Sequence, residues 1–154
     1  SQWYAVFGHG DERRGAGNDS DMNSTEHAGF VEAWDRSKPF LANALEASGG
    51  GYTVDDVLSE VEQDHAIFYP TKLGAIVFRI VRYPRKRMLR IWLAGGDMDS
   101  SIDAMLEAAE FHAAQHECDG IEVVGRRGWE KVLKPYGFEH KRVVLIKELR
   151  KPGD

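Results

Sequence analysis

Acidic and hydroxyl side chains gather at a position where α/β proteins often bind a phosphate-bearing cofactor. Residues 94–106, AGGDMDSSIDAML, follow an apolar strand pattern and open a helical one. A helix N-terminus attracts anions because its first N–H groups lack partners and it carries the positive end of the macrodipole. Asp97, Asp99 and Asp103 place carboxylates there, and Asp99 or Ser100 is the expected N-cap. These residues either only start a helix or replace the anion of a lost phosphate site.

Two histidines lie one helical turn apart further along the chain. His112 and His116 are followed by Cys118 and Asp119, a spacing that can bind zinc. However, the helical pattern of residues 100–117 places His116 near the apolar stripe, and Cys118 is expected to be a small buried side chain. We therefore expect packing here, and no metal site.

A run of basic residues is the third feature that could bind a ligand or partner. RIVRYPRKRMLR, residues 79–90, holds six cations, and its central YPRK is typical of a hairpin turn. Such a patch binds an acidic protein surface or, less readily in a chain of net charge −5, a nucleic acid. The alternative is a solvated tip that protects a strand edge. The expected partner-binding residues are Arg82, Arg85, Lys86 and Arg87.

Composition bounds the class of protein. The chain has 154 residues, 42% hydrophobic and 29% charged, which suits one soluble domain with a sizeable core. No apolar run approaches the roughly 20 residues of a membrane span, and the first ten residues lack signal-peptide features. We therefore expect no membrane contact and a cytoplasmic origin. Residues 1–64 hold 13 acidic and four basic residues, so the acidic charge is concentrated in that half.

The first 28 residues are expected to form an extended polar arm, with the domain over 29–154. Residues 8–28 contain only three apolar side chains, too few to offset the entropy lost on ordering. The arm therefore either lies on its own domain or is held by another protein chain, which includes a further copy of this one. The expected anchors are Trp3, Tyr4 and Phe7, because aromatic side chains carry much of the energy of an interface.

The remaining pattern predicts helices and strands in a recognisable order. Helices are expected at residues 30–37 and 37–51, separated near Pro39, and at 53–63. Next come strands at 65–69, 72–83 and 87–96, a helix at 100–117, a strand at 120–125, a helix at 128–137 and a closing strand at 139–149. This order predicts a mixed α/β fold, with a mixed sheet and helices on both faces.

That order, ending in GIEVVGRRGWEKVLKPYGFEHKRVVLIKEL, resembles the fold of the GNAT family of acyl-CoA N-acyltransferases over roughly residues 30–150. More narrowly, ASGGGYTVDDVLSEVEQ, the basic hairpin and CDGIEVVGRRGWEKVLKPYGF resemble the small acetyltransferase-like proteins of tailed bacteriophages. The resemblance implies that the strands at 87–94 and 120–124 are neighbours in a sheet that opens beside them. It also implies that the protein is located in the bacterial host cytoplasm and then in the virion.

The family's acetyl-CoA motif is not carried over. Its Gln/Arg-x-x-Gly-x-Gly/Ala pattern falls on Asp97, Ser100 and Ile102, and none of the three matches. The proton-donating Tyr that many members carry is Leu133 here, and Tyr136 is expected to face elsewhere on its helix. The strand at 87–94 also lacks a carboxylate that could act as a general base.

These departures predict a degenerate acetyl-CoA site, with no catalytic residue and no cofactor, in a virion-associated structural or interaction component. The alternative is an active acetyl-CoA-dependent N-acetyltransferase that modifies an amine or a protein. The cofactor-binding residues of that alternative are the backbone groups of Leu93, Ala94, Ser100 and Ser101, with Arg126 or Arg127 reaching phosphate.

Overall fold

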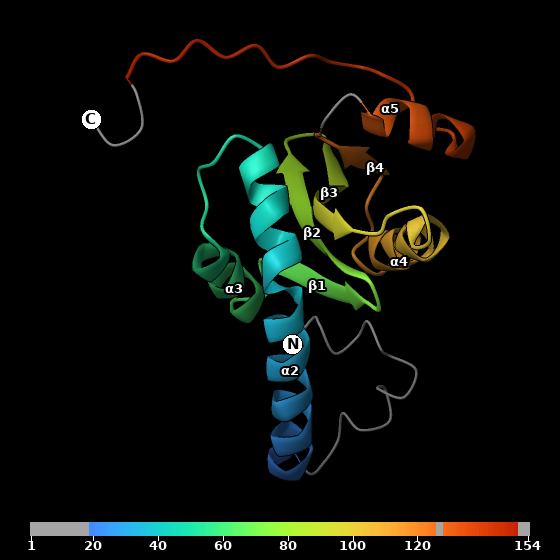
Figure 1. Cartoon of the computed structure of the whole chain (residues 1–154). Helices are drawn as coiled ribbons and strands as arrows, with labels where there is room; N and C mark the ends of the chain where they lie inside the picture. The colour runs from blue at the N-terminus through green and yellow to red at the C-terminus, as the bar shows by residue number, and fades with distance from the viewer. Residues whose placement is uncertain (1–18, 126–127, 151–154) are drawn as a thin grey trace. The chain divides into compact units, whose positions relative to one another are not determined.

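A computed structural model describes residues 19–125 and 128–150, and their side chains from residue 26 onward. Contacts divide the chain into two compact units, with the boundary between Val124 and Gly125. The first unit contains two helices, three strands, a helix and a fourth strand (Figure 1). The two units are described separately below.

The first helix, α2 (Asp19–Ala47), is continuous and contains Pro39. The predicted separation into two helices at Pro39 was wrong, because one buried face runs past the proline. Trp34, Ser37, Leu41 and Leu45 are buried at spacings of three and four residues, so both halves pack on the same sheet. This packing offsets the hydrogen bond that a proline removes from a helix interior.

The same helix changes the description of the polar arm. Residues 19–28, expected to be extended, form the first turns of α2. A low apolar content argues against a separate core, but it does not prevent a helix from continuing beyond turns that are already packed, because propagation costs less than nucleation. Residues 1–18 lie outside the described residues, and with them the predicted anchors Trp3, Tyr4 and Phe7.

Four strands form one mixed sheet in the order β1-β2-β3-β4. β1 (Ala66–Thr71), β2 (Gly74–Tyr83) and β3 (Lys86–Gly96) form the predicted antiparallel meander. α4 (Ile102–Gln115) then leads to β4 (Gly120–Val123), which pairs parallel with β3. These elements confirm the predicted order through residue 123.

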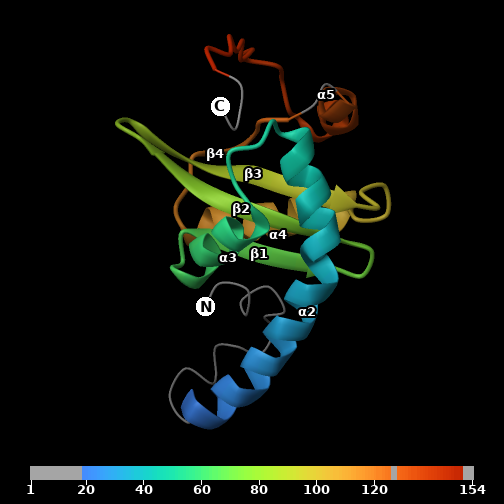
Figure 2. The same cartoon turned by 60° about the vertical axis from the view of Figure 1, so that its left-hand side comes forward.

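Helices cover both faces of the sheet, as predicted. α2 and α3 (Val54–Glu62) pack on one face, and α4 packs on the other (Figures 1 and 2). Alternate strand residues supply the two cores: Phe68 and Val77 belong to the α2 side, while Phe78 contacts His112 of α4. None of the helices in the described ranges is long and apolar enough to cross a membrane.

The second unit contains α5 (Gly128–Leu133) and a single 3-10 turn, η2 (Lys134–Tyr136). Gly137 ends this turn in the left-handed conformation, with φ of 93°. Residues 138–148 then run without regular secondary structure. The predicted closing strand at 139–149 is therefore absent from the described chain, because a strand requires a partner and this segment pairs with none of the described strands.

Candidate functional site

The sheet opens where β3 outruns its parallel neighbour. β4 pairs with β3 only from Met88 to Ile91. Just beyond, the β2–β3 register shifts, because Val77 lies opposite Leu93 while Phe78 lies opposite Ile91. Trp92 is therefore the extra residue of a β-bulge, which bends a strand and ends regular pairing. Leu93–Gly96 continue beside β2 with none of the described strands on their other side, as the resemblance implies.

The loop from β3 to α4 uses its backbone donors within the chain. The N–H of Asp97 donates to the Leu73 carbonyl at 2.9 Å, and that of Ser101 to the Met98 carbonyl at 3.0 Å. The N–H of Ser100 donates to Asp97 Oδ1 at 3.3 Å. A phosphate-binding loop needs such N–H groups directed at the ligand. Here the N–H groups of Asp97, Ser100 and Ser101 bond to the loop itself and to the β1–β2 turn.

The glycines of this loop serve packing. A Cβ on Gly95 would clash with the backbone carbonyl of Phe40 in α2. Gly96 has φ of 97° and lies so close to the β1–β2 turn that a Cβ would clash with the Leu73 carbonyl. The Gly-Gly pair therefore lets helix α2 and the turn approach β3. Packing alone accounts for two glycines at a position that is typical of a ligand-binding loop.

The start of α4 differs from the prediction by one or two residues. Its N-cap is Ser101, not Asp99 or Ser100, and Ser101 makes no side-chain capping bond. Asp103 lies in the first turn, as predicted. Asp97 is exposed and caps the turn before the helix through Ser100, so one of the three aspartates occupies an N–H group that a phosphate would otherwise use.

Ser100 and Ser101 line a cavity of about 450 Å³ between the β1–β2 turn and the start of α4. The hydroxyl oxygen of Thr71 is buried there without a hydrogen-bond partner. Sequence reasoning missed this cavity because its two walls are some thirty residues apart in the chain and neither is a motif. Its lining residues are Tyr69, Pro70, Thr71, Lys72, Leu73, Ser100, Ser101 and Ala104.

Aromatic side chains and one arginine lie together at the bulge. The guanidinium of Arg79 lies 4.5 Å from the centre of the Trp92 ring, within range of a cation–π interaction. It also donates to the Tyr52 hydroxyl at 3.1 Å and to Glu60 at 3.0 Å. Sequence analysis did not find this cluster, although three consecutive apolar residues at 91–93 interrupt the strand alternation and signal a bulge. Arg79 is thus held inside the fold.

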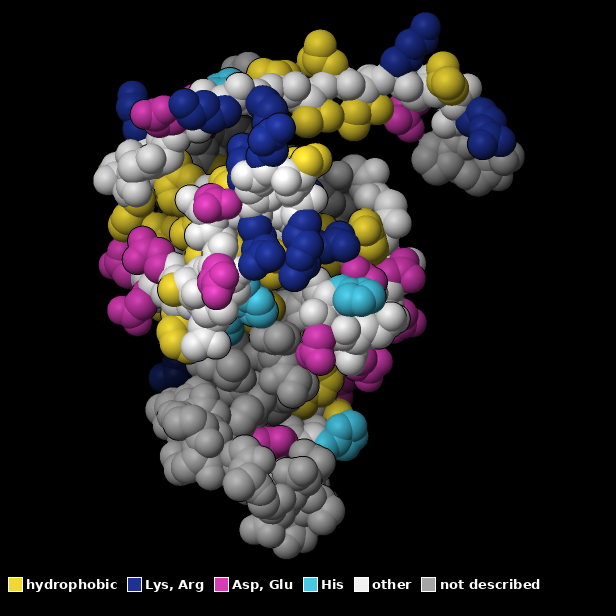
Figure 3. All heavy atoms as spheres, turned by 180° about the vertical axis from the view of Figure 1, so that it is seen from behind, with side chains coloured by type: hydrophobic (Ala, Val, Ile, Leu, Met, Phe, Trp, Pro, Cys, Tyr) yellow, Lys and Arg dark blue, Asp and Glu magenta, His cyan; other side chains and the backbone are white. Residues whose placement is uncertain are grey.

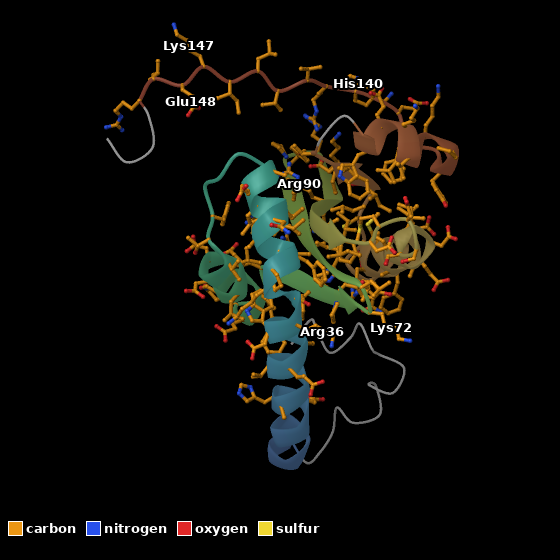
Figure 4. The ribbon with its side chains drawn as sticks, viewed as in Figure 1. Arg36, Lys72, Arg90, His140, Lys147 and Glu148 are labelled. Atoms are coloured by element: carbon orange, nitrogen blue, oxygen red, sulfur yellow. The ribbon has the colours of Figure 1, made fainter. Side chains whose placement is uncertain are left out.

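The basic hairpin divides into structural and exposed cations. Arg87 donates from Nη1 to the His116 carbonyl at 2.8 Å and so holds the C-terminal end of α4. Arg90 pairs with the partly buried Glu122 of β4 at 2.6 Å (Figure 4). Arg82, Arg85 and Lys86 are exposed. Seen from behind, a group of Lys and Arg side chains gathers on the face of the molecule (Figure 3).

Of the two histidines, His112 lies within α4 and is buried, and His116 is the C-cap of that helix and is half-buried. His112 is buried against Phe78, and burial, followed by the charge of His116, lowers its pKa to about 4. Burial also lowers the pKa of His116 and raises that of the Cys118 thiol. Within residues 19–125 and 128–150, no group of three or more His, Cys, Asp or Glu residues could hold a metal ion.

Potential acid–base groups are scarce around the opening. β3 contains no carboxylate along its whole length. In the second unit, Leu133 is buried and Tyr136 is exposed. Arg126 and Arg127, the predicted phosphate contacts, lie outside the described residues. The expected absence of a carboxylate from this strand therefore holds along β3 as the structure describes it, and the titratable groups near the opening come from other elements, such as Tyr69 in the cavity lining and Asp97 in the loop.

Comparisons with solved structures establish the fold. The chain is similar to a structure described as a probable acetyltransferase, with 13% identity and a TM-score of 0.58, over 80% of this chain and 95% of that one. It is also similar to TTHA1254 from Thermus thermophilus, with 16% identity and a TM-score of 0.54, over 78% of this chain and 93% of that one. No family model and no curated protein matches the sequence. The fold is GNAT-like.

Proposed function

We propose that this GNAT-fold chain does not transfer acetyl groups and acts as a protein-interaction component, in a bacteriophage virion or during takeover of the host. The observation that carries the proposal is the closed loop between β3 and α4. Three of its N–H groups, on Asp97, Ser100 and Ser101, donate within the chain. Acetyl-CoA would have to displace these bonds and also approach the carboxylates of Asp97 and Asp99.

The exposed cations of the hairpin are the proposed contact with a partner. Arg82, Arg85 and Lys86 stand at the β2–β3 turn, while Arg87 and Arg90 are engaged within the fold. An acidic protein surface is the favoured partner, and nucleic acid is less favoured. The host cytoplasm and then the virion form the setting that the phage resemblance implies.

One observation favours the rival function of an active N-acetyltransferase. The side of Leu93 and Ala94 away from β2 has none of the described strands beside it, so none of those strands pairs with their backbone groups where an extended ligand would bind. In that function the N–H groups of Ser100 and Ser101 would turn toward phosphate. The enzyme and the interaction component therefore differ in whether acetyl-CoA opens this loop.

Calorimetric titration with acetyl-CoA separates the two functions. We expect no binding in the micromolar range by the full chain. A variant that carries Asp97→Gln, Ser100→Gly and Ile102→Gly restores the family motif. It is expected to be less stable than the unaltered chain, because glycine lowers helix propensity and a half-buried Ile is lost. Micromolar binding by the unaltered chain would overturn the proposal.

A further inference from the structure

The cavity beside the start of α4 is walled by the outer strand of the sheet. It lies between the β1–β2 turn and the first turn of α4, whereas the opening lies beside β3. The Tyr69 ring contacts Phe78, which in turn contacts His112 of α4. Because alternate residues of a strand share a face, Thr71 faces the α4 side together with Tyr69. Both residues therefore present their hydroxyl-bearing side chains on the side of the sheet where the cavity lies.

The size and lining of this cavity suit a small molecule. Its volume of about 450 Å³ is within the range of about 300–1,000 Å³ that is common for small-molecule sites. Such sites combine an apolar wall with a few polar groups. Here Pro70, Leu73 and Ala104 supply apolar surface. The polar groups are four hydroxyls and the ammonium group of Lys72, which stands at the β1–β2 turn (Figure 4).

Two hydroxyl groups of the lining are buried without an internal partner. The hydroxyl oxygen of Thr71 has no hydrogen-bond partner among the described residues. Ser101 is only 6% exposed, and its side chain makes no capping bond to α4. The neighbouring Ser100 differs, because its hydroxyl donates to the Asp97 carbonyl at 3.3 Å. Since a buried hydroxyl without a partner is costly and rare, Thr71 and Ser101 favour a ligand that supplies acceptors.

The charges around the cavity indicate the class of ligand. Lys72 supplies a positive charge, and the first turn of α4 adds the positive end of the helix dipole. The Tyr69 hydroxyl remains protonated and able to donate, because burial, followed by the charge of Glu107, raises its pKa. These groups favour an anionic acceptor. Glu107 and the exposed Asp97 and Asp99 of the adjoining loop disfavour a second negative charge on the ligand.

We propose that this cavity binds a small molecule with one carboxylate and a short apolar body. The carboxylate accepts hydrogen bonds from the hydroxyls of Thr71 and Ser101 and from the ammonium group of Lys72. The apolar body lies against Leu73 and Ala104. Binding here leaves the hydrogen bonds of the loop between β3 and α4 in place. The proposal is therefore independent of whether the chain binds acetyl-CoA.

Butanoate is the probe that tests the ligand class. In NMR titrations of the isotope-labelled full chain, it should shift the amide signals of residues 71–73 and 100–104 saturably, with a Kd of about 10 mM or tighter. The matched controls are butanamide, which is uncharged, and butyl phosphate, which is doubly charged above neutral pH. Both should bind at least about fivefold more weakly than butanoate. Equal binding of butanamide, tighter binding of butyl phosphate or no saturable shift would each overturn the proposal.

Four variants test the groups that hold the carboxylate. Ser101→Ala and Lys72→Gln should each weaken butanoate binding about fivefold, because each removes a hydrogen-bond donor. Thr71→Val should weaken binding as much, yet it should unfold at the same urea concentration as the unaltered chain or a higher one, because it removes an unpartnered hydroxyl. Ser100→Ala is the matched control and should retain binding, since that hydroxyl already donates to Asp97. Equal losses in Ser100→Ala and Ser101→Ala would contradict the proposed contacts.

Discussion

The loop at residues 94–101 and the segment at residues 139–150 both differ from what their residue types predict, in opposite ways. The loop contains the glycines, serines and aspartates of a ligand site, yet three of its backbone N–H groups are bonded within the fold and its glycines are packed. The segment has the composition of a buried strand, yet its apolar side chains are exposed. Residue types that point to a ligand can therefore serve packing, and residue types typical of a core strand can stand in a segment without regular secondary structure.

The largest effect is expected when the packing of the loop is disturbed at Gly96. Gly96→Ala is expected to lower the free energy of unfolding by about 3 kcal/mol, because the new Cβ combines a strained φ with a clash against the Leu73 carbonyl. Gly49→Ala is the matched control, since Gly49 has nearly the same φ, 94°, with open space around it. It should cost only about 1 kcal/mol. Urea unfolding measures both, and equal losses would contradict the tight packing of the loop.

The second prediction concerns α4, the helix that follows the loop, and how the free energy of unfolding changes with pH. Because the pKa of His112 is lowered to about 4 in the folded chain, the unfolded chain binds more protons between that value and about 6.5. The contribution of His112 to the free energy of unfolding is thus fully present above about pH 6.5, and the free energy falls by up to about 3 kcal/mol as the pH drops to about 4. His112→Leu should flatten this dependence in urea unfolding curves. His27→Leu, at an exposed position, should retain it.

The smallest effect is expected when the carboxylate of Asp97, which accepts a hydrogen bond within the loop, is removed. Asp97→Ala removes the acceptor of the Ser100 N–H and is expected to cost about 1 kcal/mol of unfolding free energy. Asp99→Ala, a neighbouring exposed carboxylate, should cost less than half of that. If the two variants lose the same stability in thermal unfolding, the aspartates act through general charge and not through this hydrogen bond.

Local pattern predicted the order of elements well where packing agrees with it. The meander of β1 to β3 follows from short-range signals, and the parallel β4 follows from the strand–helix–strand order of residues 87–125. Pro39 misled the prediction of α2 because a local helix-breaking signal was outweighed by a long buried face. The closing strand was predicted from its own residues, whereas a strand forms only with a partner that the pattern does not identify.

The site was predicted less completely, because its properties depend on distant contacts. The mismatches at Asp97, Ser100 and Leu133 are visible in the sequence. That the N–H of Asp97 bonds to Leu73 is not visible, since the two residues meet only through sheet pairing. The same is true of Arg79, which sequence analysis placed in a basic patch and which the fold holds against Trp92.

The bulge at Trp92 also gives the molecule an optical reporter. An indole ring responds in its emission wavelength and lifetime to nearby charge, and the Arg79 guanidinium lies 4.5 Å from the centre of this ring. The chain has four tryptophans, so replacing Trp3, Trp34 and Trp129 with Phe leaves Trp92 as the single fluorophore. Because Trp92 is where β3 leaves its parallel neighbour, we expect its emission to change when a ligand or partner enters the opening, which would report binding without a label.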